Sequence, residues 1–125
     1  LPQGYGMSKV SAVYAKEPEV TPSVSPNKEI EAYVREVFGK DTEKAMKILS
    51  CENKHLNPKA INVNQGGSSR DYGIFQINDY WQGFNSTSVR FLKNYKVNVL
   101  IAKQIYDESG GSFKRWSCSK KVGVL

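Results

Sequence analysis

Two carboxylic acids, Glu52 and Asp71, stand in contrasting surroundings along the chain. Glu52 continues the apolar stripe that a predicted helix forms with Ala45, Ile48 and Leu49, so we expect its side chain to point inward. Burial and the negative end of the helix dipole both disfavour a charged carboxylate at this position. We therefore expect the pKa of Glu52 to be raised, which would let it hold a proton near neutral pH and act as a general acid.

Asp71 has the opposite surroundings. It follows Arg70 in a predicted strand, and the facing strand offers the amide donors Asn62 and Asn64. Such donors and a nearby cation favour the ionised form of a carboxylate. A protonated acid and an ionised one can together split a glycosidic bond, because one protonates the leaving oxygen while the other attacks or stabilises the sugar. A plain structural role also fits, with Glu52 bending out to solvent and Asp71 forming a turn.

A second chemistry would use a thiol. Cys51 and His55 are four residues apart, which would let them meet on one helix. Pro58 should end that helix nearby, and no third residue stands out to orient the histidine. The single histidine and the scattered acids lack the spacing of metal ligands, so we expect neither a metal nor a cofactor.

The helix that carries Glu52 is the second of two that the pattern predicts. The first begins at Asn27 and ends at Gly39. Its apolar residues follow helical spacing: Ile30, Tyr33, Val34, Val37 and Phe38. Asp41 can cap the second helix, which we expect to end near residues 53–55.

The segment that carries Asp71 has a different period. Residues 61–64 alternate between apolar and polar, and after a glycine-rich turn residues 70–74 can return antiparallel, which predicts a small hairpin. Helical patterns resume at residues 87–95 and, more strongly, at residues 97–108. We therefore expect an α+β fold that is mostly helical and carries one small antiparallel β-hairpin.

The chain has 125 residues, which is room for one domain with one hydrophobic core. Residues 1–26 hold four of the five prolines and show no periodicity, so we expect a flexible tail or linker there and the domain at 27–125. The longest apolar run, residues 99–102, is far too short to span a membrane. The chain begins at Leu1 without a recognisable signal peptide, so we expect a processed or truncated start.

The net charge of +6 belongs entirely to the part after residue 26, where sixteen basic residues face ten acidic ones. A basic domain favours polyanionic partners such as bacterial wall polymers, nucleic acid or anionic lipid, although the charge can also serve solubility alone. Four basic residues gather near the C-terminus: Lys114, Arg115, Lys120 and Lys121. They belong to no recognisable nucleic-acid-binding module, so we expect no nucleic acid partner.

Cys51 and Cys118 are the only cysteines, and they lie 67 positions apart. A disulfide between them would stabilise the fold by roughly 4 kcal/mol through the entropy of the closed loop. Two buried free thiols fit the sequence equally well, and the choice depends on export to an oxidising compartment.

The stretch "CENKHLNPKAINVNQGGSSRDYGIFQINDYW", residues 51–81, resembles the core of the animal (chicken-type) lysozymes and, more broadly, the lysozyme-like lytic transglycosylase superfamily. The resemblance depends on the helix-terminal Glu52, on Asp71-Tyr72-Gly73, on Gln76-Ile77-Asn78 and on several single residues: Asn57, Ala60, Asn62, Asn64 and Trp81. A looser match continues to Trp116. It implies a lysozyme-like fold in which the hairpin lies beside an active-site cleft. The proline-rich start and the two cysteines look more bacterial or phage-like than animal.

The resemblance implies roles for these residues. Glu52 would be the general acid and later the base, and Asp71 the nucleophile or electrostatic stabiliser. The substrate-binding residues would be Asn62, Asn64, Gln76, Asn78, Trp81 and Trp116. Asn78 would present hydrogen bonds to an N-acetyl group, and Trp81 would stack on a sugar ring unless it packs in the core. Trp116 or Phe113 would pack against the catalytic glutamate.

The implied activity is hydrolysis of the β-1,4 bond between N-acetylmuramic acid and N-acetylglucosamine in peptidoglycan. One alternative is a lytic transglycosylase that uses Glu52 alone and gives 1,6-anhydro products; another is a glycan-binding relative without catalysis. The expected partners are peptidoglycan glycan strands and anionic wall polymers. We expect a monomer that is secreted or located in the cell wall or periplasm. A Cys51–Cys118 disulfide would tie the catalytic helix to the C-terminal segment.

Overall fold

A computed structural model describes residues 26–125 as an α+β fold that is mostly helical and includes one small antiparallel sheet. The expected fold class is thus confirmed. The predicted tail, residues 1–26, lies outside the described residues except for Pro26, which begins the first helix. Proline is well suited to that position, because the first turn of a helix leaves its backbone N–H groups unbonded anyway.

The two helices predicted before Asp71 are present as helix α2, Pro26–Phe38, and helix α3, Thr42–Glu52. Helix α2 ends where Gly39 adopts a positive φ of 53°. The predicted side-chain cap from Asp41 is wrong, since Asp41 makes no capping hydrogen bond. Instead the hydroxyl of Thr42 donates to the Gly39 carbonyl at 2.6 Å, which fixes the tight connection between the helices.

The predicted hairpin is confirmed and gains a third strand. Strands β1, Ile61–Val63, β2, Arg70–Tyr72, and β3, Ile77–Asn78, form an antiparallel sheet in the order β1-β2-β3. In this register Asp71 lies on the central strand, opposite Asn62 on one side and Asn78 on the other. Strand β3 was not expected, because two residues are too few to reveal an alternating pattern.

In the second half of the chain one predicted helix is confirmed, another is wrong, and one helix was not predicted. Helix α4, Tyr95–Glu108, confirms the expected helix at residues 97–108. The helix expected at residues 87–95 is wrong: only a short 3-10 helix forms, Val89–Lys93. The side chain of Asn85 accepts backbone hydrogen bonds from Thr87 and Ser88, so the preceding residues form a turn instead. A short helix α5, Cys118–Val122, was not expected.

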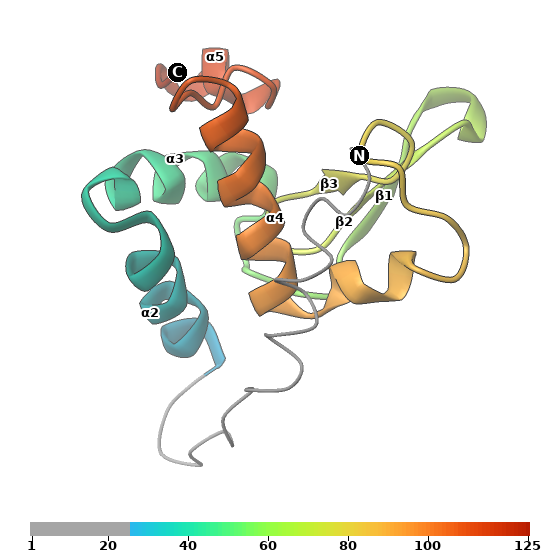
Figure 1. Ribbon diagram of the computed structural model, residues 1–125, viewed down its shortest axis with the longest axis horizontal. Helices are drawn as coiled ribbons and strands as arrows, with labels where there is room; N and C mark the ends of the chain where they lie inside the picture. Colours follow the sequence, from blue (N-terminus) through green and yellow to red (C-terminus); the bar gives the residue numbers. More distant parts are fainter. Residues whose placement is uncertain (1–25) are drawn as a thin grey trace.

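The core lies between the helices and the sheet, and Figure 1 shows the sheet on one side of α4 with α2 and α3 on the other. Aromatic rings from distant parts of the chain pack together there: Phe38, Phe75, Tyr106, Phe113 and Trp116. A fully buried asparagine, Asn98 of α4, binds the turn between β2 and β3. Its amide donates to the carbonyls of Tyr72 and Leu92, and its oxygen accepts from the Phe75 N–H at 2.7 Å.

Cys51 and Cys118 form a disulfide with an S–S distance of 2.02 Å, which joins the end of α3 to the start of α5. This pairing confirms the disulfide and excludes the thiol chemistry considered for Cys51 and His55, since neither described cysteine is free. Among residues 26–125, no helix is long and apolar enough to cross a membrane.

Candidate active site

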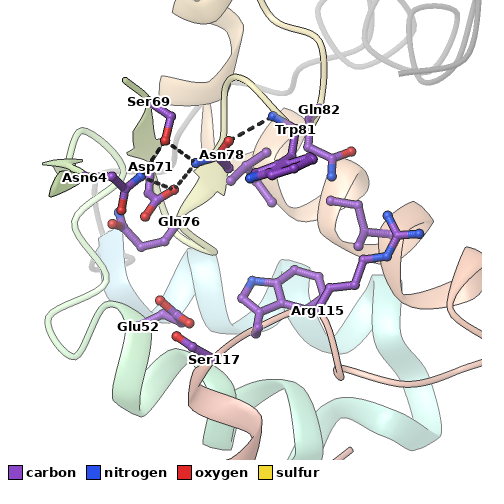
Figure 2. A pocket seen from close by; sticks show the side chains of 13 residues that line it. Glu52, Asn64, Ser69, Asp71, Gln76, Asn78, Trp81, Gln82, Arg115 and Ser117 are labelled. Atoms are coloured by element: carbon purple, nitrogen blue, oxygen red, sulfur yellow. Dashed lines mark hydrogen bonds between the residues drawn. The ribbon is translucent and has the colours of Figure 1, made fainter. Parts of the chain in front are cut away.

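A cleft of about 790 Å³ lies between the sheet and the helical part of the molecule. Residues from both sides line it: Glu52, Asn64, Ser69, Asp71, Gln76, Ile77, Asn78, Trp81, Gln82, Ile105, Arg115, Trp116 and Ser117. Both acids that the sequence singled out are present. Figure 2 shows Glu52 and Asp71 on opposite walls, each facing the space between them.

Glu52 is the last residue of α3 and is half-buried. Burial raises the pKa of its carboxyl, and the negative charge of Asp71 raises that pKa further. A backbone hydrogen bond from Cys118 and the positive charge of Lys121 act in the opposite direction but do not cancel the rise. The expected direction is confirmed, with burial as the largest cause and the charge of Asp71 as the second.

Asp71 is held by amides. Its Oδ1 accepts hydrogen bonds from the side-chain amide of Asn78 at 2.9 Å and from that of Asn64 at 3.3 Å. These two hydrogen bonds hold the carboxyl group in position on the wall of the cleft. The expected cation is absent, because Arg70 forms no ion pair with Asp71 within the described part of the chain. The two side chains belong to neighbouring positions of one strand and therefore point to opposite faces of the sheet.

Ser69 completes the support of Asp71, a role that was not predicted from the sequence. Its hydroxyl oxygen accepts from Asn64 at 2.9 Å and from Asn78 at 3.0 Å, so one serine holds both amides that bind the carboxylate (Figure 2). Ser69 sits in the turn before β2, where a serine usually indicates nothing more than a turn. Its role depends on the sheet register, which brings Asn78 alongside.

Two of the expected substrate-binding residues are used within the protein. Asn62 does not line the cleft; its amide donates to the Gln76 side-chain oxygen at 2.5 Å. Gln76 is buried, adopts a left-handed φ of 52°, and donates to the Gly73 carbonyl at 2.9 Å. Asn62 therefore lies behind the cleft, whereas Gln76 lines it with its side-chain amide bonded within the protein.

The side chain of Asn78 also forms hydrogen bonds within the protein. Besides donating to Asp71, it accepts a hydrogen bond from the Trp81 backbone N–H at 2.9 Å. The hydrogen bonds expected from Asn78 to an N-acetyl group stay a prediction. Within the protein, Asn78 links the carboxylate to the segment that carries Trp81.

The two tryptophans have different surroundings. The side chain of Trp81 is 75% exposed and lies edge-on to Tyr80, which is 68% exposed, so the core interpretation of Trp81 is wrong. Trp116 is 6% exposed and donates from Nε1 to the Phe75 carbonyl at 2.8 Å. Trp116 lines the cleft while Phe113 is fully buried behind it. Trp116 is thus the aromatic residue that shares the cleft with Glu52.

The sequence missed several cleft residues because they lie in irregular segments or on unexpected faces: Ser69, Ile77, Gln82, Ile105, Arg115 and Ser117. Of these only Arg115 carries a charge. Among residues 26–125, no group of three or more potential metal ligands is present.

The cleft can therefore do acid–base chemistry on a bond that lies between the two walls. It combines a half-buried acid whose pKa is raised, a carboxylate held by amides, and an exposed aromatic ring. No protein-family model, curated protein or solved structure matches the chain.

Proposed function

We propose that the protein is a glycoside hydrolase that cleaves the β-1,4 bond between N-acetylmuramic acid and N-acetylglucosamine in peptidoglycan. The observation that carries the proposal is the raised pKa of Glu52 across the cleft from Asp71. A raised pKa lets Glu52 keep a proton to donate, while Asp71 faces it across the cleft, held by two amides. Hydrolysis of a glycosidic bond by two carboxylic acids uses this combination.

In the proposed reaction Glu52 donates its proton to the oxygen of the leaving sugar as the bond to the anomeric carbon breaks. Asp71 attacks that carbon or stabilises its positive charge from the opposite face. A water molecule then adds to the anomeric carbon, displaces the Asp71 carboxylate if it has bonded to that carbon, and gives a proton to Glu52, which restores both carboxyl groups to the starting state. The exposed ring of Trp81 provides a surface on which a sugar can stack.

Peptidoglycan is proposed as the substrate because of the resemblance of residues 51–81 to lysozymes and because of the basic charge of the domain. The Cys51–Cys118 disulfide agrees with a protein that works outside the reducing cytosol. Export to the cell wall, the periplasm or the medium is therefore part of the proposal.

Asp71 favours hydrolysis over the lytic transglycosylase reaction, in which the acid acts alone and a hydroxyl of the substrate attacks. Three hydrogen-bonding residues hold this carboxylate or its donors, an arrangement that a passive side chain would not require. A purely glycan-binding protein is disfavoured for a related reason, since a half-buried acid beside a second carboxylate destabilises the fold without aiding binding.

The test compares clearing of a bacterial wall suspension by the wild type, Glu52→Gln and Asp71→Asn, with mass spectrometry of the products. Glu52→Gln should lower the rate by at least about a hundredfold, because general acid catalysis contributes on that scale. Asp71→Asn should also lower it strongly, and the products should have reducing ends. Anhydro products with an active Asp71→Asn variant would instead identify a transglycosylase. Wall binding without clearing by the wild type would refute catalysis.

A further inference from the structure

The charges that line the cleft are few and unevenly arranged. Only three lining residues carry an ionisable side chain: the acids Glu52 and Asp71, and the cation Arg115. Figure 2 shows the guanidinium of Arg115 toward the Trp81 and Gln82 end of the cleft, away from the two acids. The cleft therefore has an acidic end, where bond cleavage is proposed, and a cationic end.

Arg115 is held in place at its backbone while its side chain is available. Its neighbours Phe113 and Trp116 are both buried, and the Trp116 N–H donates to the Phe113 carbonyl at 2.9 Å. The Arg115 side chain is exposed, and within residues 26–125 it forms neither an ion pair nor a hydrogen bond. An arginine so placed can bind an anion from the ligand without breaking an existing contact.

The guanidinium group selects for a particular ligand chemistry. Its planar fork matches a carboxylate through two parallel hydrogen bonds, whereas a neutral sugar offers no charged partner. The proposed substrate carries carboxylates at regular intervals along the strand, either on the lactyl ether of each muramic acid or on the peptide stem attached to it. The acidic end of the cleft would repel such a group, so the two ends together would orient the strand.

We propose that Arg115 is a specificity-determining residue that binds a carboxylate of the glycan strand and so favours acidic strands over neutral ones. This inference rests on the proposed function. It adds that the cleft recognises the charge of the substrate as well as its sugar rings, and that the recognised carboxylate lies toward Trp81 rather than at the cleaved bond.

The test uses matched soluble strands of alternating N-acetylglucosamine and N-acetylmuramic acid. One set has free lactyl carboxylates, and a second has them converted to neutral methylamides. A third set carries peptide stems with free carboxylates, and a fourth has those stem carboxylates amidated. The enzymes are the wild type, Arg115→Gln, Arg115→Lys, and the control Lys114→Gln, which removes an adjacent exposed charge that does not line the cleft.

We expect Arg115→Gln to lower kcat/KM by about tenfold on one of the two charged sets, because a charge-assisted hydrogen bond at an exposed site contributes on that scale. The charged set that is affected identifies the carboxylate source. Both neutral sets should be unaffected, Arg115→Lys should retain part of the preference, and Lys114→Gln should behave as the wild type. Equal loss on charged and neutral strands, or no loss on any, would overturn the role of Arg115.

Calorimetric binding of the same strands separates this inference from the proposed function. If the wild type cleaves no strand, the proposed hydrolysis fails, yet tighter binding of charged strands that disappears in Arg115→Gln would still support recognition by Arg115. Equal affinity of the wild type for charged and neutral strands would refute it.

Discussion

At the scale of single residues, the behaviour of Glu52 depends on the charges that act on it across the cleft. Asp71 raises its pKa and Lys121 lowers it, while burial gives the largest contribution. The activity of a general acid is lost as pH rises through its pKa, so these charges should set the alkaline limb of the pH profile.

Lys121→Gln tests this dependence without touching the cleft. Removing the positive charge should raise the pKa of Glu52, so the alkaline limb of kcat/KM should move to higher pH while the maximal rate changes less than about twofold. The shift should shrink in high salt, because Lys121 is exposed. Lys120→Gln is the control, since that neighbouring lysine is also exposed and does not act on Glu52. An identical shift in both variants would show that the overall charge of the protein, and not Lys121 in particular, acts on Glu52.

Glu52→Gln should change the pH dependence of stability. The folded protein holds the Glu52 proton more tightly than the unfolded chain, whose carboxyl has the ordinary pKa of 4.5. Stability from this group is therefore complete below that pH and is lost as pH rises through the folded pKa. Relative to the wild type, Glu52→Gln should gain stability as pH rises, by at most about 1 kcal/mol at neutral pH because the group is partly solvated.

Urea unfolding at a series of pH values measures this difference. Well below pH 4.5 the carboxyl is protonated in both states, so the stability difference between Glu52→Gln and the wild type should no longer change with pH. If Glu52→Gln is less stable than the wild type by the same amount at neutral and at acidic pH, the result would contradict a raised pKa of Glu52.

The residue-scale predictions succeeded where a local pattern carries the information. Glu52 could be identified because its apolar neighbours recur every three or four positions, which fixes the face it occupies. Ser69 and Arg115 could not, because both lie outside regular elements and reach the cleft only through contacts with distant segments. The partner of Asn62 could not be predicted either. Its side chain binds Gln76 and not Asp71, because the folded structure decides which side chains meet.

At the scale of elements, the turn between β2 and β3 controls the position of the cleft wall. Gly73 adopts a positive φ of 74°, and a Cβ there would overlap the Asn98 side chain and lie 2.5 Å from the Leu92 carbonyl oxygen. Asn98 also binds both Tyr72 and Phe75 and so fixes the turn to α4. Its side chain fits there because Gly73 has no Cβ.

Gly73→Ala should therefore lose about 2–4 kcal/mol of stability, from steric overlap together with the left-handed backbone. Gly66→Ala is the matched control, because Gly66 has a positive φ of 81° but nothing within 4 Å of the added carbon. It should lose only about 1 kcal/mol. Chemical denaturation of both variants measures the difference, and similar losses would show that overlap at Gly73 is relieved by movement of its neighbours.

The disulfide is the second element-scale feature, because it joins α3 and α5 next to Glu52. Replacing both cysteines by serine should destabilise the protein by about 2–4 kcal/mol, the usual range for a long closed loop. Activity should fall as well, since Cys118 supplies a backbone hydrogen bond to Glu52. Urea unfolding and kcat/KM measure the two effects. Thiol reduction should reproduce them in the wild type and leave the double variant unchanged; equal stability of all forms would contradict the prediction.

Elements were predictable in proportion to their length and periodicity. Helix α4 was found because fourteen residues carry a clear apolar face. Strand β3 and helix α5 have two and five residues, so their sequences contain too few repeats of either period. The 3-10 helix at Val89–Lys93 was mistaken for a longer helix because the side-chain hydrogen bonds of Asn85, which form a turn before it, are invisible in a hydrophobic pattern.

At the scale of the whole molecule, the cleft depends on contacts between segments far apart in sequence. Trp116 binds the Phe75 carbonyl, Asn98 binds the Tyr72 carbonyl, and Cys51 bonds to Cys118. Each contact joins an early segment to a late one across the core. Sequence spacing describes near neighbours, which is why the fold class could be predicted while Ile105, Arg115 and Ser117 could not be assigned to the cleft.

The net charge of +6 acts on the molecule as a whole and leads to a prediction about ionic strength. A basic protein is drawn to a polyanionic wall over distances comparable to the screening length, which shortens from about 30 Å at 0.01 M salt to about 8 Å at 0.15 M. The rate of wall clearing should therefore fall by about tenfold over this range. Cleavage of a short soluble strand with neutral methylamide groups should change less than about twofold, because neither steering nor Arg115 then contributes. If the rates on both substrates fall equally, salt acts on the cleft itself, and the prediction that the basic surface attracts the enzyme to the wall is contradicted.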